Sequence, residues 1–575
     1  MKKLNWLIVP LFALLLAACG DNDQSSAPET SDTAAASAMV SIANPYAAEA
    51  AMDILNEGGT AIDAAIAALA VLGLVEPQSS GIGGGGFLLY YDAESGEVSA
   101  YDGRETAPNA IRPEHFQNPD GSPRSFFDIV RGGTSVGVPG SLAVLELVHE
   151  AHGNLPWGDL FDGAIALAED GFEISPRLRW SMTRAPWTAQ MPDTVAYFYD
   201  EAGAVREAGS ILQNMAYGET LRTIAAEGAD AFYEGDLAEA IVAKVTRSEI
   251  NPGLLSVQDM AGYTAVERDV ICTPYRAYQI CGMPPPTSGS MIIQMVLGMV
   301  EGYDLAALEP GSAEAVHLIS EASRLAFADR DMFIADSDFV AVPTLGLVSE
   351  DYLARRASLI SPFSSLGVTA AGNPWPDEME ERSPDETPDV PGTNHMSIVD
   401  GYGNAVSFNS SVESVFGSHL MVGGFFLNNQ LTDFSRALQR DGRPIANGAA
   451  PGKRPRSSMA PIIILDEAGE LFAVIGSSGG SRIPLAVAQD TIAIIDWNMG
   501  MQEALDLPRH SNRNGSTDLE VGTELAEIAP TLEAMGHVVR QVRFDSGTHG
   551  IMIRDGVMEG GADPRREGVV LSDQE

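Results

Sequence analysis

The stretch that most constrains this chain of 575 residues is Pro391 to Ser418, PGTNHMSIVDGYGNAVSFNSSVESVFGS. Two β-rich runs flank the sequence Gly401-Tyr402-Gly403-Asn404. Glycine and asparagine adopt the backbone angles of tight turns at the lowest cost. The stretch therefore predicts a single β-hairpin.

The register of this hairpin places a hydroxyl group at each of its two ends. If Asp400 pairs with Ala405, Thr393 lies opposite residues 411 and 412. We therefore expect Thr393 and Ser411 to be neighbours in space, although they are far apart along the chain. A surface hairpin rich in serine and threonine would give the same pattern without any chemistry.

Thr393 is a candidate nucleophile that could supply its own base. A threonine hydroxyl needs a neighbouring base at neutral pH, and no His or Lys stands nearby in the usual triad spacing. A cut before Thr393 would free an α-amine with a pKa near ~8, which can accept the hydroxyl proton. Gly392 favours such a cut because a residue without Cβ tolerates a strained backbone and leaves its carbonyl open to attack.

The run from Thr393 to Ser435 resembles the start of the small subunit of the γ-glutamyltransferases, which are N-terminal-nucleophile (Ntn) hydrolases. The similarity extends from about Asn44 to the Gly-Gly-Ala-Asp-Pro-Arg segment at 560–565. It implies an α/β (α+β) fold, the four-layer αββα sandwich. It also implies self-cleavage into a large subunit, 39–392, and a small subunit, 393–575, which together form a heterodimer.

The resemblance gives three segments a role in binding the substrate. Arg104, in YDGRETAP, would clamp the substrate α-carboxylate, although an isolated arginine is more often part of a surface ion pair. Asp433 and Gln430, in FFLNNQLTDF, would hold the ammonium group, although an Asx turn and a helix cap explain them equally well. In the resembling enzymes, a serine pair corresponding to Ser457 and Ser458 also binds the α-carboxylate.

Gly479 and Gly480 are the candidate oxyanion hole. Backbone N–H groups without a neighbouring Cβ are suited to stabilising an oxyanion, at about 3 kcal/mol per donor. The other interpretation of this Gly-Gly pair is a simple turn. With Thr393 and Ser411 they complete the candidate catalytic set, and the resemblance requires neither a metal nor a cofactor.

Two positions and one segment matter for the comparison with the family pattern. Asn394 replaces the second threonine of most relatives, and Glu413 stands where relatives have Asn or Glu and would contact the ammonium group. Between Ser435 and Lys453 the chain is shorter than in relatives with an active-site lid, and it has no tyrosine there. We therefore expect no lid, and an open pocket would also admit larger acyl groups.

The activity implied by the resemblance is transfer of a γ-glutamyl group from glutathione or a related donor to water, an amino acid or a peptide. The first alternative is a glutaryl or cephalosporin acylase with the same nucleophile. A second alternative, from another class, is a lipid-anchored solute-binding protein that uses the same pocket without turnover.

The N-terminus predicts export and lipidation. Lys2 and Lys3 precede an apolar run that ends in Leu16-Ala17-Ala18-Cys19, similar to a bacterial lipobox. We expect a signal peptide at 1–18, lipidation of Cys19 and a disordered tether at 19–38. The resemblance to lipoproteins implies sorting to the outer membrane when the residue after the cysteine is not aspartate, and here that residue is Gly20. The protein would then face the periplasm or the cell surface.

The remaining composition narrows the partners and the redox state. The formal net charge of −45 argues against binding nucleic acid or an anionic membrane surface. Cys272 and Cys281 flank a predicted turn, and an oxidising periplasm favours a disulfide between them over a metal site. Two buried free thiols are the alternative.

Several helices and strands are also predictable. Asn44-Pro45 is a helix start, and the run 61–74 is apolar on nearly all sides, which predicts a buried helix. Residues 87–91 and 462–465 read as strands. The Pro-rich and acidic segment 365–392 has the composition of an exposed loop.

Overall fold

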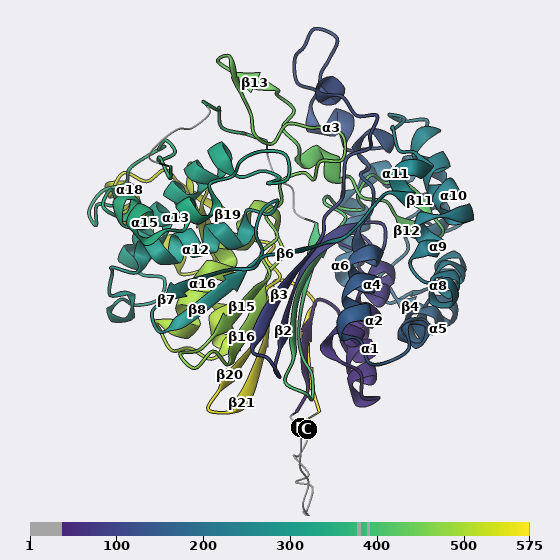
Figure 1. Ribbon diagram of the computed structural model, residues 1–575, viewed down its shortest axis with the longest axis horizontal. Coiled ribbons are helices and arrows are strands. Elements are labelled where there is room, and N and C mark those ends of the chain that lie inside the picture. Colours follow the sequence, from purple (N-terminus) through teal and green to yellow (C-terminus); the bar gives the residue numbers. More distant parts are fainter. Residues whose placement is uncertain (1–36, 376–380, 388–391, 574–575) are drawn as a thin grey trace, which may run out of the picture. The chain divides into compact units, whose positions relative to one another are not determined.

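The computed structural model describes residues 37–375, 381–387 and 392–573. Within this part of the chain, two antiparallel sheets lie face to face between two layers of helices (Figure 1). The predicted four-layer αββα sandwich is therefore confirmed. The predicted signal peptide, Cys19 and nearly all of the tether lie outside the described residues. In the part that is described, no helix has both the length and the apolar character to cross a membrane.

The first sheet contains the hairpin that carries Thr393. Its strand order is β22-β1-β9-β10-β2-β3-β6. The strands are β22 (Val569–Ser572), β1 (Met39–Ile42), β9 (Thr393–Val399), β10 (Ala405–Ser411), β2 (Gly85–Asp92), β3 (Glu97–Gly103) and β6 (Val266–Arg268). Every residue of β9 and β10 is buried. The candidate nucleophile therefore starts a central, fully covered strand, which excludes the surface hairpin.

The second sheet carries the candidate oxyanion loop at the end of one of its strands. Its order is β21-β20-β16-β15-β8-β7. The strands are β21 (Val557–Ala562), β20 (His549–Arg554), β16 (Leu471–Gly476), β15 (Ile462–Leu465), β8 (Tyr278–Gly282) and β7 (Ile271–Tyr275). Apolar side chains of both sheets, among them Phe87, Leu89, Val474 and Ile551, form one buried cluster. This cluster holds the two sheets together.

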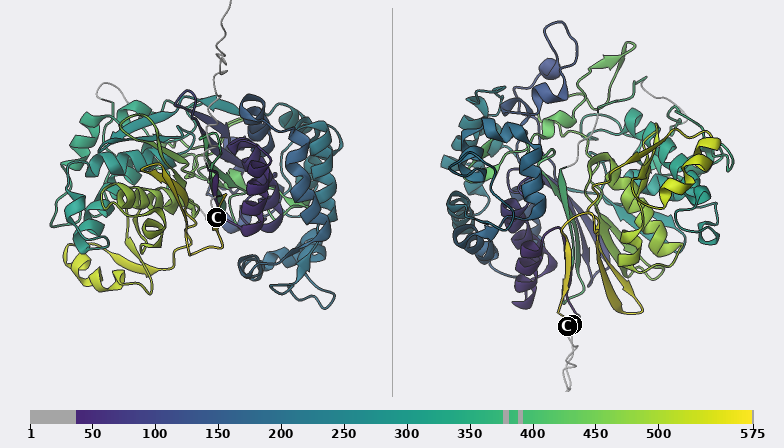
Figure 2. Two further views of the ribbon diagram at one scale, coloured as in Figure 1. Left: turned by 90° about the horizontal axis from the view of Figure 1, so that it is seen from below. Right: turned by 180° about the vertical axis from the view of Figure 1, so that it is seen from behind.

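Helices cover the outer face of each sheet (Figures 1 and 2). On the side of the first sheet lie α1 (Pro45–Asn56), α2 (Ala61–Val75), α4 (Ser141–His152), α5 (Asp162–Asp170), α8 (Met215–Glu227) and α10 (Gly235–Thr246). On the side of the second lie α12 (Gly289–Val300), α13 (Ala313–Phe333), α15 (Glu350–Ala357) and α16 (Ile483–Ile495). All residues of α2 are buried, as its apolar sequence predicted. Asn44 caps α1, and Thr60 forms a capping box with Asp63 at α2.

The hairpin register differs by one residue from the pairing assumed above. Ala405 pairs with Val399 rather than with Asp400, so the connecting loop spans 400–404. The Asp400 side chain accepts hydrogen bonds from the backbone N–H groups of Tyr402 and Asn404, which accounts for its position in the loop. Thr393 consequently pairs directly with Ser411, so the expected neighbours are indeed neighbours.

The segment before the hairpin is only partly the exposed loop that its composition predicted. Asp385 is buried and pairs with Arg456 at 3.0 Å. Burial raises the pKa of Asp385, but the Arg456 charge and hydrogen bonds from Asn447 and Thr387 outweigh it, and the net shift is downward. Composition misled here because a buried acid is stable when a cation and hydrogen-bond donors surround it.

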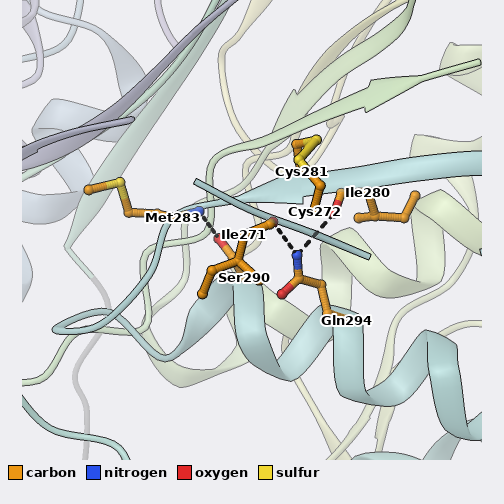
Figure 3. Close-up of a disulfide and its surroundings, with 7 residues drawn as sticks. All are labelled: Ile271, Cys272, Ile280, Cys281, Met283, Ser290 and Gln294. Atoms are coloured by element: carbon orange, nitrogen blue, oxygen red, sulfur yellow. Dashed lines mark hydrogen bonds between the residues drawn. A yellow bond between two sulfur atoms is a disulfide. The ribbon is translucent and has the colours of Figure 1, made fainter. Parts of the chain in front are cut away.

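Cys272 and Cys281 form a disulfide that joins the adjacent strands β7 and β8 (Figure 3). The two residues occupy directly opposite positions in the strand register. Beneath them, Gln294 of α12 donates to the carbonyl oxygens of Ile271 and Ile280. The free-thiol alternative does not describe this structure.

Candidate active site

The nucleophile end of the site consists of Gly392, Thr393 and Ser411. The Thr393 hydroxyl donates to Ser411 Oγ at 3.2 Å, and the Ser411 hydroxyl donates to the Gly392 carbonyl oxygen at 2.7 Å. The backbone N–H of Glu413 donates to Ser411 Oγ at 2.9 Å and fixes that side chain. Ser411 therefore contacts both the candidate nucleophile and the carbonyl of the bond at which we expect cleavage.

Gly392 occupies a position that no larger residue could share. A Cβ at this position would lie 1.9 Å from the backbone oxygen of Glu413. Glu413 itself has a φ of +79°, a left-handed conformation that is uncommon outside glycine. Asn429 donates from Nδ2 to the Glu413 carboxylate. The close approach of residues 392 and 413 brings the candidate cleavage site and a candidate ammonium ligand together.

The head-group end of the site is centred on Arg104, which is only 1% exposed. Its Nη2 donates to the Asp433 carboxylate at 2.5 Å. Nε and Nη2 also donate to the carbonyl oxygens of residues 455 and 456, at 3.1 and 3.0 Å. Ser457 and Ser458 follow directly, so all the residues expected to bind the α-carboxylate lie together. The alternative for Arg104 was a surface ion pair, but its ion pair is buried, and the partner is Asp433, the candidate ammonium ligand.

Both ends of the site lie at the same edge of the first sheet. Thr393 pairs with Ser411 on β10, Ser411 with Gly85 on β2, and Gly86 with Gly103 on β3, which leads into Arg104. Neighbouring strands are ~4.8 Å apart, so three steps separate Thr393 from this segment by ~14 Å. The arginine side chain and a bound γ-glutamyl group would together span that distance.

Gly479 and Gly480 lie in the loop that follows β16 and have φ values of +130° and +64°. Both values lie in the region that favours glycine. The loop is attached to the hairpin by Asn409, whose Nδ2 donates to the Ser477 carbonyl oxygen at 2.7 Å. The sheet packing thus brings the candidate oxyanion loop to the strand pair that carries Thr393.

Gln430 opens a short 3₁₀ helix, η6 (Gln430–Asp433). Its side chain is 1% exposed, and its Oε1 has no hydrogen-bond partner among the described residues. A buried amide oxygen without a partner is costly in a folded protein. A bound ammonium group is a donor that would satisfy it.

Glu105 is a buried carboxyl that the sequence analysis did not single out. It is fully buried, and Oε2 lies 3.7 Å from Arg104 Nη1. Neither carboxyl oxygen has a hydrogen-bond partner among the described residues. Burial raises the pKa of Glu105 to about 8, against the lowering effect of Arg104. Its position directly after Arg104 was the available signal, but the sequence could not show that this carboxyl is buried without a partner.

Arg330 is a second contributor that the sequence did not reveal. It comes from α13 and donates from Nη2 to Ser458 Oγ at 3.1 Å. Nothing in its helical sequence distinguishes it from a surface arginine, because the contact depends on how α13 packs. A helix that precedes the hairpin in the chain therefore holds the Ser458 side chain.

One group of side chains in the described region has the composition of a metal site. Suitable atoms of His317, Glu321 and His537 lie within 4.8 Å of one another. His317 Nδ1 and His537 Nε2 are 2.7 Å apart. The other ring nitrogens contact the Ser361 carbonyl oxygen and the Thr517 hydroxyl, respectively. Burial lowers the pKa of His537 to about 4. Hydrogen bonds between the two rings, and with Ser361 and Thr517, account for the positions of both imidazoles.

Comparisons with known proteins agree on one family. A sequence model of the family described as gamma-glutamyltranspeptidase matches residues 47–572. The glutathione hydrolase proenzyme of Escherichia coli K12 is 33% identical over 92% of this chain and 90% of its own length. The acylase ACY 1 proenzyme of Pseudomonas sp. strain SE83 is 34% identical over 93% of both chains. The crystal structure of cephalosporin acylase from Bacillus halodurans superposes with a TM-score of 0.81, at 27% identity, over 96% of this chain and 98% of that chain.

Proposed function

This chain belongs to the γ-glutamyltranspeptidase family, and from that premise we propose that Thr393 is the nucleophile of a self-processing γ-glutamyl hydrolase and transferase. The observation that carries the proposal is the position of the Ser411 hydroxyl. It lies within hydrogen-bond distance of both the Thr393 hydroxyl and the Gly392 carbonyl oxygen.

This arrangement supports self-cleavage by the following steps. The Thr393 hydroxyl attacks the Gly392 carbonyl carbon, and the Ser411 hydroxyl donates to the oxyanion that develops on the carbonyl oxygen. The Gly392–Thr393 amide bond breaks, an ester to Thr393 Oγ forms, and the Thr393 nitrogen takes a proton. Water then hydrolyses the ester. The products are a fragment that ends at Gly392 and a fragment that begins with a free Thr393 amine.

The same groups then act on the substrate. The Thr393 amine accepts the proton of its own hydroxyl as Oγ attacks the γ-carbonyl of the donor. The backbone N–H groups of Gly479 and Gly480 stabilise the oxyanion, and the amine returns the proton to the leaving nitrogen. Water or the amino group of an acceptor cleaves the acyl-enzyme.

Recognition of the glutamyl head group falls to the opposite end of the site. Arg104, Ser457 and Ser458 would bind the α-carboxylate. Glu413, Gln430 and Asp433 would bind the ammonium group. A carboxylate and an ammonium group entering together can replace the direct contact between Arg104 and Asp433, because each ligand charge compensates one of the separated side chains.

Mass spectrometry of the purified protein, followed by an assay with a γ-glutamyl anilide, tests the proposal. We expect fragments that end at residue 392 and begin at residue 393, and release of the anilide. A single uncut polypeptide that hydrolyses the anilide would contradict the mechanism.

An acylase of glutaryl side chains is the second candidate, and the similarity to acylase ACY 1 favours it. Glutaryl groups lack the amine, so Asp433 distinguishes the two activities. Asp433→Asn should strongly depress turnover of γ-glutamyl donors but leave glutaryl donors and self-cleavage nearly unchanged. Equal losses on both donors would show that Asp433 is structural.

We also propose that Cys19 is lipidated and anchors the enzyme to the periplasmic or outer face of a bacterial membrane. The support is the charged start, the apolar run and the Leu16-Ala17-Ala18-Cys19 sequence. Labelling with a radioactive fatty acid tests it. Wild type should carry the label and sediment with membranes, whereas Cys19→Ser should do neither. Label on both proteins would contradict the assignment.

A further inference from the structure

Arg566 connects the candidate nucleophile to the loop that begins at Asp545, a loop not yet assigned a role. Its Nη1 donates to the Thr393 carbonyl oxygen at 2.8 Å. Its Nη2 and Nε donate to the Asp545 carbonyl oxygen at 3.0 and 3.3 Å. The side chain is 1% exposed. One guanidinium therefore bridges two backbone carbonyls that are 152 positions apart along the chain.

The loop that begins at Asp545 lies along the candidate oxyanion loop. Ser478 donates from Oγ to the Gly547 carbonyl oxygen at 3.3 Å, and Thr548 donates from Oγ1 to Ser477 Oγ at 2.9 Å. A Cβ on Gly479 would lie 3.5 Å from the Asp545 carbonyl oxygen. The carbonyl that Arg566 holds is therefore next to a glycine expected to stabilise the oxyanion.

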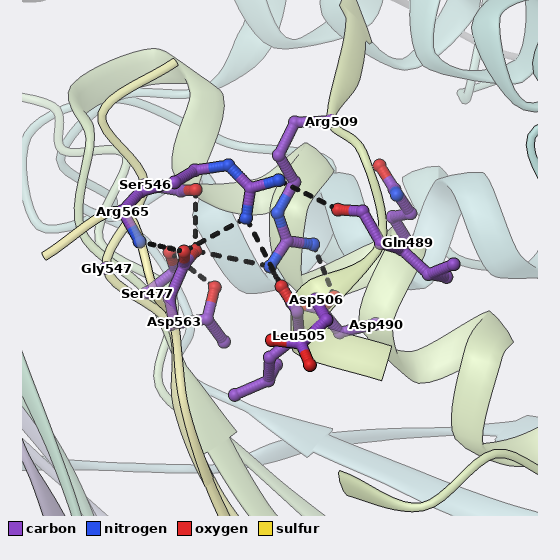
Figure 4. A network of polar contacts seen from close by, with 12 residues as sticks. Ser477, Gln489, Asp490, Leu505, Asp506, Arg509, Ser546, Gly547, Asp563 and Arg565 are labelled. Atoms are coloured by element: carbon purple, nitrogen blue, oxygen red, sulfur yellow. Dashed lines mark hydrogen bonds and ion pairs between the residues drawn. The ribbon is translucent and has the colours of Figure 1, made fainter. Parts of the chain in front are cut away.

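A network of hydrogen bonds and ion pairs fixes the loop that begins at Asp545. Ser546 donates to the Asp563 carboxylate at 2.6 Å, and Asp563 also pairs with Arg509 and Arg565 (Figure 4). Gly547 packs closely against the Arg566 side chain: a Cβ at residue 547 would lie only 2.4 Å from Arg566 Cδ. The guanidinium is thus held between a rigid loop and the first residue of β9.

We propose that Arg566 is a positioning residue that fixes Thr393 relative to the Gly479 amide, in self-cleavage and in acyl transfer. The inference rests on the proposed function of Thr393. By holding the Thr393 carbonyl, Arg566 fixes the backbone from which both the hydroxyl and the freed amine project. By holding the Asp545 carbonyl, it fixes the loop behind the oxyanion site.

Arginine suits this task better than lysine. Its planar guanidinium presents several donors in a fixed geometry, whereas an ammonium group cannot reproduce that fork. Burial lowers the pKa of Arg566 to about 10, so the side chain remains charged at neutral pH. The nearby charged groups of Glu76, Arg177, Asp545 and Asp563 act on the same side chain.

The test compares Arg566→Met and Arg566→Lys with wild type. Two quantities are measured: the rate of fragment appearance on gels, and kcat and KM of the cleaved fraction for a γ-glutamyl anilide. Displacement of a reacting group by about 1 Å can cost about 100-fold in rate, so we expect a loss of that order for Arg566→Met. Arg566→Lys should lose about tenfold, because one of the two bridged carbonyls is released. KM should stay within about twofold, since the groups assigned to the head group are unchanged.

Arg177→Met is the matched control. Arg177 is a mostly buried arginine, 13% exposed, that donates to the Asp545 carboxylate at 3.1 Å and faces Glu76. No hydrogen bond or ion pair joins it to Thr393 in the described part of the chain. This variant should keep its kcat and its rate of self-cleavage. If the role of Arg566 were purely structural, Arg566→Met and Arg177→Met would both lose thermal stability, and both would keep the wild-type kcat.

Two results overturn the inference. The first is that Arg566→Met and Arg177→Met have the same kcat and the same self-cleavage rate, within about twofold. If Arg566→Met does not fold, the charge-conserving Arg566→Lys decides, and wild-type rates in that variant are the second such result. Should wild type cut itself but release no anilide, the proposed substrate class fails, while the self-cleavage rates still test Arg566.

Discussion

The two ends of the candidate active site are built in different ways. At the nucleophile end, Gly392, Thr393 and Ser411 come from one hairpin and are joined by hydrogen bonds between uncharged groups. At the head-group end, Arg104 meets Asp433 across 329 positions of the chain, with the buried Glu105 beside them. One end depends on local strand register, and the other on long-range packing of buried charges.

This difference teaches where each kind of sensitivity should lie. Loss of a hydroxyl at the nucleophile end removes a reacting atom or its direct partner, so the effect falls on the chemical step. A change at the head-group end alters binding, and the buried Glu105 carboxyl at that end responds to pH. The four variants below test this division, and Thr393→Ala has the largest expected effect.

Thr393→Ala should remain a single polypeptide without activity, because it lacks the hydroxyl that attacks both the Gly392 carbonyl and the donor. Gel electrophoresis and the anilide assay measure the two losses. Thr393→Ser, which keeps a hydroxyl, should still be cut. An active and uncut Thr393→Ala protein would remove the hairpin from the mechanism altogether.

Ser411→Ala should slow self-cleavage by about 100- to 1000-fold, the usual cost of losing one oxyanion donor. The time course of fragment appearance measures it. Ser410→Ala is the matched control, because the neighbouring Ser410 Oγ is buried and has no hydrogen-bond partner among the described residues. Equal rates in the two variants would show that the contact between Ser411 and the Gly392 carbonyl has no part in the cleavage.

The sequence predicted the nucleophile end better than the head-group end, because the first depends on local strand register and the second on long-range packing. Turn residues and strand alternation placed Thr393 near Ser411, and the one-residue error in pairing arose in the loop, where Asp400 folds back on Asn404. No local pattern could predict that Arg104 would contact Asp433, because that contact requires the connection after β3 to meet η6. The same holds for Arg330 and Arg566, whose partners lie on distant segments.

Arg104→Lys should reduce kcat/KM for γ-glutamyl donors about 30-fold, which corresponds to a loss of binding free energy on the order of 2 kcal/mol. Most of the loss should appear as a higher KM. A lysine keeps the charge but cannot make parallel hydrogen bonds to a carboxylate. Arg268→Lys is the control, since Arg268 pairs with Asp102 and Asp338 near the same strand. If both variants behave alike, Arg104 lies outside the recognition of the substrate.

Glu105→Gln should have the smallest effect, and only at alkaline pH. At neutral pH Glu105 is largely protonated, because burial raises its pKa to about 8. Above that pH the carboxylate would repel the substrate α-carboxylate at Arg104. If only the protonated form binds, KM at pH 8.5 should be about fourfold higher than at low pH. In Glu105→Gln this rise should be absent, and titration of the donor amine and of the Thr393 amine cancels in the comparison.

The same pKa shift predicts the pH dependence of stability. The folded protein keeps the Glu105 proton up to about pH 8, whereas the unfolded chain loses it near the ordinary value of 4.5. Between these values the folded state binds more protons, so the free energy of unfolding falls as pH rises, by at most about 1.4 kcal/mol per pH unit from this group. Glu105→Gln should therefore show a shallower fall in denaturant midpoint between pH 5 and pH 8. Parallel pH curves for variant and wild type would mean that Glu105 is ionised throughout, and that Arg104 is already compensated by two carboxylates rather than one.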